Sequence, residues 1–336
     1  MTTATPVHAV PAAAFDPAPV QQVAAAATDG DGVEPLNEAA LLALRHHGLA
    51  DGALWLAGAD LAEPDGFAWV HGGEVDLVVT PAARRRGVGA ALAETVVGAL
   101  PDVALSAWSH GNHPAAARLA ARLGWERVRD LWVMRRPLTG LPPLDDAAAR
   151  ARAAGVAVRT FRPGQDADAF LALNAEAFAH HPEQGRMTRA DLDRRMAEPW
   201  FDAAGFFVAE RPVEGAGTGG GADAGTGGAE EQPTGGAPEG GPGRAGGLLG
   251  FHWTKVHDAD PPVGEVYVVG VSPGAQGIGL GRLLTLTGLH HLASLGLGEV
   301  LLYVESDNAP AIATYSGLGF THAAADTHVM YRSPSP

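Results

Sequence analysis

The sequence predicts an α/β protein with mixed sheets, built from two tandem domains that share one fold. Two stretches, residues 72–100 and 263–293, follow the same plan: a glutamate, a β-branched strand, a proline, a glycine-rich turn and a helix. Each is followed by a second strand and a short helix that ends in Leu-Gly-Trp or Leu-Gly-Phe. The copies lie about 190 residues apart, too far for the stacked units of a solenoid. Two separate α/β domains therefore explain the repetition.

Length and composition agree with two ordinary domains. The chain has 336 residues, of which 46% are hydrophobic, and a formal net charge of −15. Because negative charge repels phosphate, we expect no nucleic-acid partner. The chain has no cysteine, which excludes disulfides and cysteine nucleophiles. No apolar run spans a bilayer and residues 1–32 do not resemble a signal peptide, so we expect no membrane partner, a cytoplasmic location and a monomer.

Composition also suggests the domain boundaries. Residues 1–32 are mostly Ala, Pro, Thr and Val with little periodicity, and we interpret them as a disordered tail. We expect the first domain over residues 33–140, a linker over 141–155 and the second domain over 156–335. Within the second domain, residues 212–247 hold 15 of the 45 glycines in the chain. This composition is typical of a flexible insertion between two strands.

The glycine-rich turns have a chemical explanation. A strand, a glycine turn and a helix start present backbone N–H groups at the positive end of a helix, where phosphate binds. Neither turn has the P-loop lysine or the third glycine of the dinucleotide-binding motif. Both fit the pattern Arg/Gln-x-x-Gly-x-Gly/Ala, which begins at Gln276 in the second copy and at Arg84 in the first. For either copy alone, an ordinary strand-to-helix turn remains the alternative.

With this motif the chain resembles the GNAT superfamily of acetyl-CoA-dependent N-acetyltransferases, in which the turn grips the coenzyme A pyrophosphate. The later family motif Asn-x-x-Ala-x-x-x-Tyr-x-x-x-Gly-Phe is also present, with Asn308 at its start and Tyr315 at its tyrosine. In the family the Asn contacts the cofactor arm and the Tyr hydroxyl lies near the thioester sulfur. The first copy has His113 and Ala120 in these places. The resemblance therefore implies a first domain that binds the cofactor without catalysing transfer.

Amide formation from a thioester needs a base for the amine, a donor for the oxyanion and an acid for the leaving thiolate. Glu265 is the candidate base and Tyr315 the candidate acid. Glu265 precedes its turn by 11 positions, whereas Glu74 precedes Arg84 by 10. The extra residue, together with Gly270, predicts a β-bulge that aims the N–H groups of Val269–Val271 at the thioester carbonyl. An exposed strand-end glutamate and a core tyrosine are the alternatives.

A more specific resemblance covers nearly the whole folded chain. The segments "GVEPLNE", "HPEQG", "GFHWTKVH", "GEVYVVGV" and "LLYVESDN" are similar to those of the mycothiol synthase family, tandem GNAT enzymes. That family acetylates the cysteinyl amine of 1D-myo-inositol 2-(L-cysteinylamino)-2-deoxy-α-D-glucopyranoside, giving mycothiol and CoA. The resemblance implies that the amine substrate is bound by Glu38, Glu183, Lys255, Glu265 and Tyr303.

The same resemblance implies an acetyl-CoA site in each domain. In the second domain the implied contacts are Val269, Gly270, Val271, Gln276, Gly277, Ile278, Gly279, Leu280, Gly281, Arg282, Asn308, Ala309, Pro310, Ala311, Ile312 and Ala313. In the first domain they are Val78, Val79, Thr80, Arg84, Arg85, Arg86, Gly87, Val88, Gly89 and Ala90.

Several histidine, arginine, lysine and glutamate residues have an alternative interpretation. Paired histidines point apart on a helix or strand and no HExxH motif occurs, so we expect no metal. Three arginines at Arg84–Arg86 could be a nucleic-acid patch, but an acidic chain favours coenzyme A phosphates as their partners. Lys255 could be a solvated strand charge, and Glu183 a loop acid without function. The alternative functions are a GNAT transferase for another small amine or a peptide N-terminus, and an acetyl-CoA-binding protein without turnover.

Overall fold

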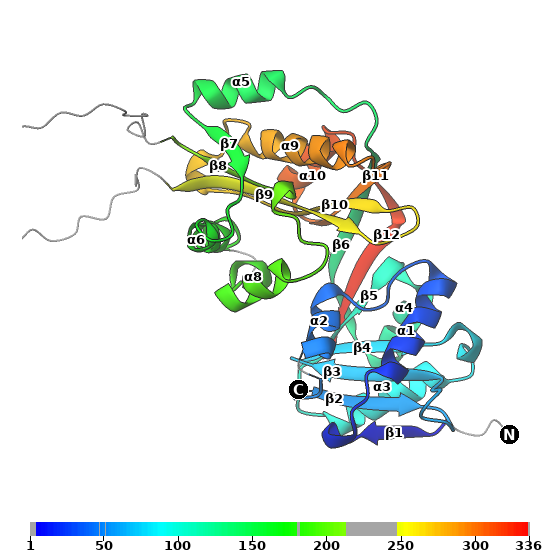
Figure 1. Cartoon of the computed structure of the whole chain (residues 1–336). Coiled ribbons are helices and arrows are strands. Elements are labelled where there is room, and N and C mark those ends of the chain that lie inside the picture. The colour runs from blue at the N-terminus through cyan, green and yellow to red at the C-terminus, as the bar shows by residue number, and fades with distance from the viewer. Residues whose placement is uncertain (1–4, 47, 51, 180–181, 213–246, 335–336) are drawn as a thin grey trace, which may run out of the picture. The chain divides into compact units, whose positions relative to one another are not determined.

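A computed structural model describes residues 5–46, 48–50, 52–179, 182–212 and 247–334. The chain divides into two compact units, each assembled from more than one segment (Figure 1). Unit 1 comprises Met1–Met134, Tyr303–Ser316 and Phe320–Pro336, and unit 2 comprises Arg135–Leu302 and Gly317–Gly319. No helix within the described ranges is long and apolar enough to cross a membrane.

Unit 1 is built on a mixed sheet that combines strands β1 to β6 with β12, which lies near the end of the chain. Its strands are β1 (Val7–Val10), β2 (Gly52–Ala57), β3 (Gly66–His71), β4 (Glu74–Val79), β5 (Ser106–Ser109), β6 (Glu126–Pro137) and β12 (Thr321–Arg332). Their order in the sheet is β1-β2-β3-β4-β5-β12-β6. The strands β1 to β4 are antiparallel neighbours, β4 and β5 are parallel, and β12 is antiparallel to β5.

Helices cover both faces of this sheet. The helices of unit 1 are α1 (Ala18–Asp31), α2 (Glu38–His46), α3 (Val88–Ala99), α4 (Pro114–Leu123) and α10 (Ala309–Ser316), with short 3-10 turns at Ala12–Ala14, Pro81–Ala83 and His110–Asn112. Side chains alternate along β3, so that Phe67 and Trp69 pack in the same cluster as residues of α1 and α2. Ala68 and Val70 point the other way and pack with α3.

The expectation of a disordered tail over residues 1–32 is wrong for Val7–Asp31. Strand β1 pairs with β2, and α1 buries Val20, Val23 and Ala27 almost completely. These three residues follow helical spacing and form a narrow stripe that packs on Phe67 and Trp69. The alanines around the stripe are apolar too, so the sequence shows little contrast between its buried and exposed faces.

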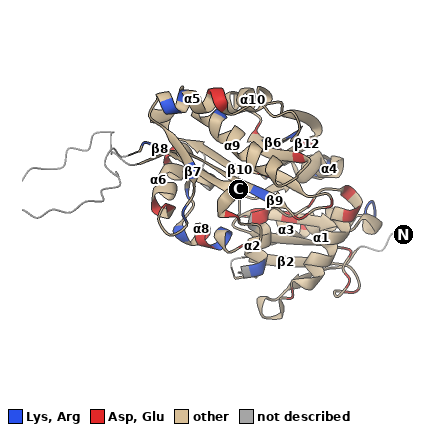
Figure 2. Cartoon of the chain, turned by 45° about the horizontal axis from the view of Figure 1, so that its top comes forward, with Lys and Arg blue, Asp and Glu red and all other residues tan. Residues whose placement is uncertain are grey.

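Unit 2 repeats the plan with a larger aromatic core. Its strands are β7 (Ala157–Thr160), β8 (Phe206–Glu210), β9 (Leu248–His257), β10 (Val263–Val271) and β11 (Glu299–Glu305), in the order β11-β10-β9-β8-β7. Its helices are α5 (Asp145–Ala153), α6 (Ala167–Ala177), α7 (Pro182–Gly185), α8 (Arg189–Met196) and α9 (Leu280–Ser294), with 3-10 turns at Ala203–Gly205 and Pro273–Ala275. Helices α5 and α8 each carry both acidic and basic residues (Figure 2).

Two of the expected boundaries differ from the observed units. The expected linker 141–155 contains α5, whose Ala147 and Ala151 are buried with Leu283 and Leu284 of α9. The expected second domain ended at residue 335, but α10 and β12 belong to unit 1. The predicted insertion lies between the antiparallel neighbours β8 and β9, and its residues 213–246 lie outside the described residues.

Candidate active site

The glycine-rich turn of unit 2 links β10 to the start of α9. Gly277 has φ 83° and Gly279 has φ 79°, a left-handed conformation that glycine adopts without strain. Gly279 is the N-cap of α9 and offers no capping side chain. A Cβ atom on either glycine would meet nothing within 4 Å. The main chain of this turn therefore has open space beside Gly277 and Gly279, and a helix start of this kind is a common anion site.

Unit 1 has a turn of the same shape. Gly87 is the N-cap of α3 with φ 90°, and Arg85 takes the place of Gly277 with φ 60°. A side chain in this conformation costs about 1–2 kcal/mol. The turn keeps its left-handed residue although that residue is an arginine, so the backbone shape of the predicted cradle is present in both units.

The arginines of the unit 1 turn already have partners. The Arg84 guanidinium donates to both carboxylate oxygens of Asp31, at 2.6 and 2.7 Å, and to the Val79 carbonyl at 3.2 Å. The hydrogen bonds from Arg84 hold the pKa of Asp31 below its usual value. Arg86 lies 3.7 Å from Asp65. Asp31 is the last residue of α1, in a segment that the sequence predicts to be disordered, so the sequence did not predict this partner of Arg84.

Strand β10 contains the predicted bulge. Glu265 pairs with Lys255 and Val266 with Thr254, but Val268 is the next paired residue, so the extra residue is Tyr267 and not Gly270. Gly270 has a packing role instead, because a Cβ there would lie 2.5 Å from the Phe251 ring. In unit 1 the β3–β4 register runs without a shift. The bulge accounts for the difference in spacing between the two copies.

Glu265 is held in a buried hydrogen bond. Its side chain is 6% exposed, and its Oε2 atom lies 2.7 Å from Nε2 of His257, which is 33% exposed. Lys255 lies directly opposite Glu265 on β9. The Lys255 ammonium sits 4.7 Å from the ring centre of Trp200 and 5.4 Å from that of Tyr267. A carboxylate and an ammonium thus occupy neighbouring positions beside the bulge.

Sequence reasoning missed four residues of this group. His257, Trp200 and Tyr267 contact Glu265 or Lys255, and Arg195 donates to the Tyr267 hydroxyl at 2.9 Å. One signal was available, because His257 follows Lys255 by two positions and so shares its face of the strand. The others needed the bulge and the fold of α8, which no local pattern encodes.

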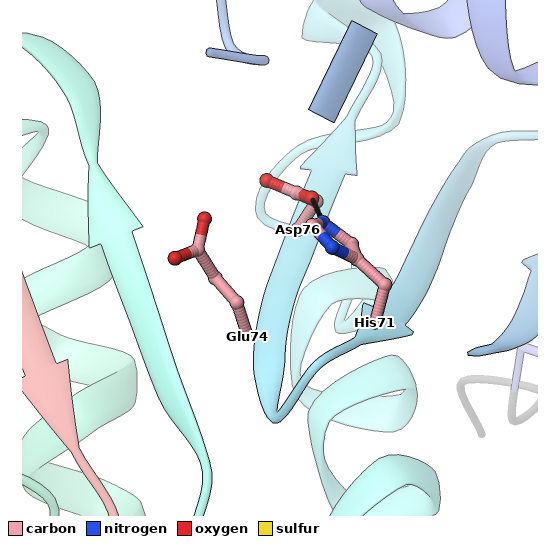
Figure 3. A group of neighbouring side chains, drawn as sticks. All are labelled: His71, Glu74 and Asp76. Carbon is pink, nitrogen blue, oxygen red and sulfur yellow. Dashed lines mark hydrogen bonds and ion pairs between the residues drawn. The ribbon is translucent and has the colours of Figure 1, made fainter. Parts of the chain in front are cut away.

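The equivalent place in unit 1 has different chemistry. By strand register, His71 takes the place of Lys255, Glu74 that of Glu265 and Asp76 that of Val268. His71 Nε2 lies 2.9 Å from Asp76 Oδ2, with the Glu74 carboxylate beside the pair (Figure 3). Burial opposes protonation of His71, yet the hydrogen bond with Asp76 and the negative charges of Asp76 and Glu74 together outweigh burial and raise the His71 pKa.

The His71, Glu74 and Asp76 side chains are a group of possible metal ligands in the described part of the chain. Their ligand atoms lie within 4.8 Å of one another. Both carboxylates already have hydrogen-bond partners in the protein: Asp76 contacts His71, and Glu74 accepts a hydrogen bond from Asn37 at 3.1 Å. The absence of a metal stays a prediction.

The helices that follow the second strand of each copy are equivalent. The Tyr315 carbonyl accepts a hydrogen bond from the Phe320 N–H at 3.1 Å, and the Ala120 carbonyl accepts one from Trp125 at 2.9 Å. Alanine therefore stands where α10 has its tyrosine, as the sequence alignment of the copies predicts. Burial raises the pKa of Tyr315 to about 12, so its phenol keeps the proton at neutral pH.

The remaining predicted site residues divide between the two units. Glu183 lies in α7 of unit 2. Glu38 begins α2 and belongs to unit 1. Tyr303 is 40% exposed, and its ring lies 5.5 Å from that of His328. The division between the units falls within β11, so Tyr303 belongs to unit 1 although the first residues of the strand belong to unit 2. Asn308–Ala313 and Tyr315 also belong to unit 1, whereas Glu265 and the α9 turn belong to unit 2. That all of them act at one thioester stays a prediction.

Two relatives of known name are similar to the chain over nearly its whole length. A mycothiol acetyltransferase of Nocardioides sp. is 50% identical over 325 residues, covering 94% of this chain and 97% of that protein. A mycothiol acetyltransferase of Streptosporangium roseum is 50% identical over 335 residues, covering 94% and 95% of the two chains. The chain belongs to the mycothiol acetyltransferase family.

The fold comparisons agree with this membership. The model of the acetyltransferase (GNAT) family matches residues 183–320. A tandem GNAT protein from the clavulanic acid biosynthesis pathway superposes with a TM-score of 0.64 at 19% identity, covering 98% of this chain and 99% of that one. A GCN5-related N-acetyltransferase from Sphaerobacter thermophilus gives 0.62 at 21% identity, covering 98% and 95%.

Membership of the mycothiol acetyltransferase family settles the reaction class. The chain is an acetyltransferase with a GNAT fold, and GNAT acetyltransferases use acetyl-CoA. A small molecule accepts the acetyl group. The glycine turns are therefore the expected anchors of the coenzyme A phosphates.

Proposed function

We propose that the chain transfers acetyl from acetyl-CoA to the cysteinyl amine of 1D-myo-inositol 2-(L-cysteinylamino)-2-deoxy-α-D-glucopyranoside, giving mycothiol and CoA. The observation that carries the proposal is the buried Glu265 on the bulged strand that leads into the open turn before α9. The names of the relatives supply the substrate class. The proposed step uses side chains and main-chain amides and needs no metal ion.

The proposed base is Glu265. Its carboxylate takes a proton from the substrate ammonium, so that the amine nitrogen can form a bond to the acetyl carbon while the carbon–sulfur bond breaks. The backbone after the bulge, Val269–Val271, is the proposed donor to the carbonyl oxygen. Lys255, Glu38, Glu183 and Tyr303 are the proposed contacts of the substrate, which carries an ammonium group and many hydroxyls.

The proposed acid is Tyr315. It is assigned on the family motif and on a phenol that stays protonated at neutral pH. The departing thiolate takes this proton, which balances the proton that Glu265 receives. Unit 1 has Ala120 at the equivalent place and no bulge in β4. We therefore assign catalysis to the site that contains Glu265, and cofactor binding without transfer to the turn before α3.

The substrate assignment is tested by mass spectrometry of the products. Purified protein is incubated with acetyl-CoA and a panel of amines: the cysteinyl amino-sugar inositol, a polyamine and a peptide with a free N-terminus. We expect acetylation of the cysteinyl amine and release of one CoA for each acetyl group transferred. Transfer only to another amine would replace the proposed substrate, and binding of acetyl-CoA without any transfer would refute the enzyme assignment.

The catalytic residue is tested with a pair of matched variants. Glu265→Gln should lower kcat by about 10²- to 10⁴-fold, the usual contribution of a general base. Glu74→Gln changes the equivalent glutamate of unit 1 and should leave kcat unchanged. Steady-state kinetics with the cysteinyl substrate measure both. A Glu265→Gln enzyme with normal kcat would remove the proposed base, and a large loss in Glu74→Gln would refute the division of labour between the two sites.

A further inference from the structure

We propose that His257 is a positioning residue for the base: it fixes one oxygen of Glu265 and leaves the other free for the substrate ammonium. This inference rests on the proposed function of Glu265. His257 is the last residue of β9, and its Nε2 atom lies 2.7 Å from Oε2 of the carboxylate. An ionised carboxylate only accepts hydrogen bonds, so Nε2 carries the hydrogen and donates it.

Burial makes Glu265 depend on hydrogen-bond donors of the protein. The residue is 5% exposed, so its carboxylate has lost most of its water partners. The charged or polar partners on β9 are His257 and, directly opposite, Lys255. On the other side, Glu265 is paired with the apolar Leu301 of β11. The hydrogen bond from His257 therefore supplies Oε2 with a protein donor in place of water.

The same bond restricts the geometry of the base. Because Oε2 is held by His257, the carboxylate plane is fixed and Oε1 is the oxygen that remains for the ammonium. The N–H bond of the substrate breaks as the Oε1–H bond forms, and the His257 proton stays on Nε2 throughout. A misplaced catalytic group lowers the rate by about 100-fold per ångström in unfavourable cases. Loss of His257 should thus act on kcat more than on substrate binding.

Two variants separate positioning from simple packing. His257→Ala removes the donor, whereas His257→Gln replaces it with an amide N–H of similar reach. We expect His257→Ala to lower kcat by about 10- to 100-fold with little change in the KM of the amine. His257→Gln should restore kcat to within a few-fold.

The chain offers a matched control in the other histidine–carboxylate pair. His71 also ends a strand and contacts a buried carboxylate, that of Asp76, at 2.9 Å. His71→Ala should leave kcat and the KM of the amine unchanged. Normal kinetics in His257→Ala, or a His257→Gln enzyme as slow as His257→Ala, would overturn the positioning role. If Glu265→Gln is fully active, the base assignment fails and this inference with it; if Glu265→Gln is inactive while His257→Ala is normal, only this inference fails.

Discussion

At the residue scale, the close contact between α9 and β9 in unit 2 depends on a glycine. Gly288 lies in α9 where the helix crosses β9. A Cβ atom there would lie 2.1 Å from Cε1 of His252 and 2.8 Å from Cγ2 of Thr254. His252 is fully buried and donates from Nδ1 to the Leu284 carbonyl at 2.8 Å, so neither neighbour has space to move. The helix can approach the strand only because position 288 is glycine.

Gly288→Ala should therefore destabilise the protein by about 1–3 kcal/mol, the usual range for an overpacked core. The matched control is Gly98→Ala, which makes the same exchange inside α3, where a Cβ meets nothing within 4 Å. That variant should be neutral or gain up to about 1 kcal/mol, because alanine favours helix. Urea unfolding followed by circular dichroism measures both. Equal effects of the two substitutions would contradict the packing argument.

Two buried histidines should make the folded protein sensitive to mild acid. Burial lowers the pKa of His252 from 6.5 to about 4, and burial and His328 together lower that of His110 to about 4. Above pH 6.5 both histidines are neutral in the folded and unfolded chain. Between pH 6.5 and 4 only the unfolded chain takes up these protons, so stability falls as pH falls. At about 1.4 kcal/mol per unit, each histidine accounts for about 3 kcal/mol across this range.

The measurement is the urea midpoint between pH 7.5 and 4.5. His252→Gln removes one of the two groups and should flatten the decline with pH. His8→Gln replaces an exposed histidine and should leave the slope as it is. A decline that is the same in all three proteins would mean that these histidines do not govern the acid sensitivity.

At the element scale, the turn before α9 combines strain-free glycines with an open helix end. Gly279 and Gly296 stand at opposite ends of α9 with nearly equal φ angles, 79° and 80°, and a Cβ on either meets nothing within 4 Å. Alanine at either place should cost about 1–2 kcal/mol of conformational strain. Only Gly279 belongs to the N-terminal end that presents free N–H groups.

Gly279→Ala should accordingly raise the KM of acetyl-CoA by about 10-fold, equivalent to about 1.4 kcal/mol of lost binding. Gly296→Ala should lose similar stability but keep the KM. Steady-state kinetics at saturating amine compare the two, with thermal unfolding as the check on stability. A KM that rises equally in both variants would show that the effect is general destabilisation.

At the scale of the whole molecule, unit 1 contains both the first 134 residues and strand β12 from near the end of the chain. Strand β12 is a hydrogen-bonded neighbour of β5, and its Val329 and Tyr331 are buried with Ala120 of α4. A fragment of residues 1–140 lacks β12 and α10. It exposes the edge of β5 and the apolar residues of α4, and unpaired edges favour aggregation.

We expect the 1–140 fragment to be insoluble or to unfold without cooperativity, although its length suits an independent domain. The full chain, treated identically, should unfold cooperatively. Solubility and urea unfolding provide the measurement. A soluble fragment with a sharp transition would show that β12 is dispensable for unit 1.

The sequence by itself determined the fold class, the two copies, the glycine turns and the bulge in β10, because each depends on local spacing. The position of Glu265 before the glycine turn also made it the candidate base. The alignment of Ala120 with Tyr315 agrees with the equivalent hydrogen bonds of the two helices. The sequence predicted the bulge from the extra residue and Gly270 but did not locate it at Tyr267, because a count along one strand does not contain the register with its neighbour.

Only the tertiary structure decided which segments share a unit and which side chains support the base. Helix α1 was overlooked because its buried valines stand among alanines of similar hydropathy. The hydrogen bond from Leu105, just before β5, to Ser333, just after β12, joins residues 228 positions apart in the sequence. The hydrogen bond from Arg84 to Asp31 joins residues 53 positions apart. Contacts at such separations are set by the closure of the whole sheet and core, and a local pattern carries no information about them.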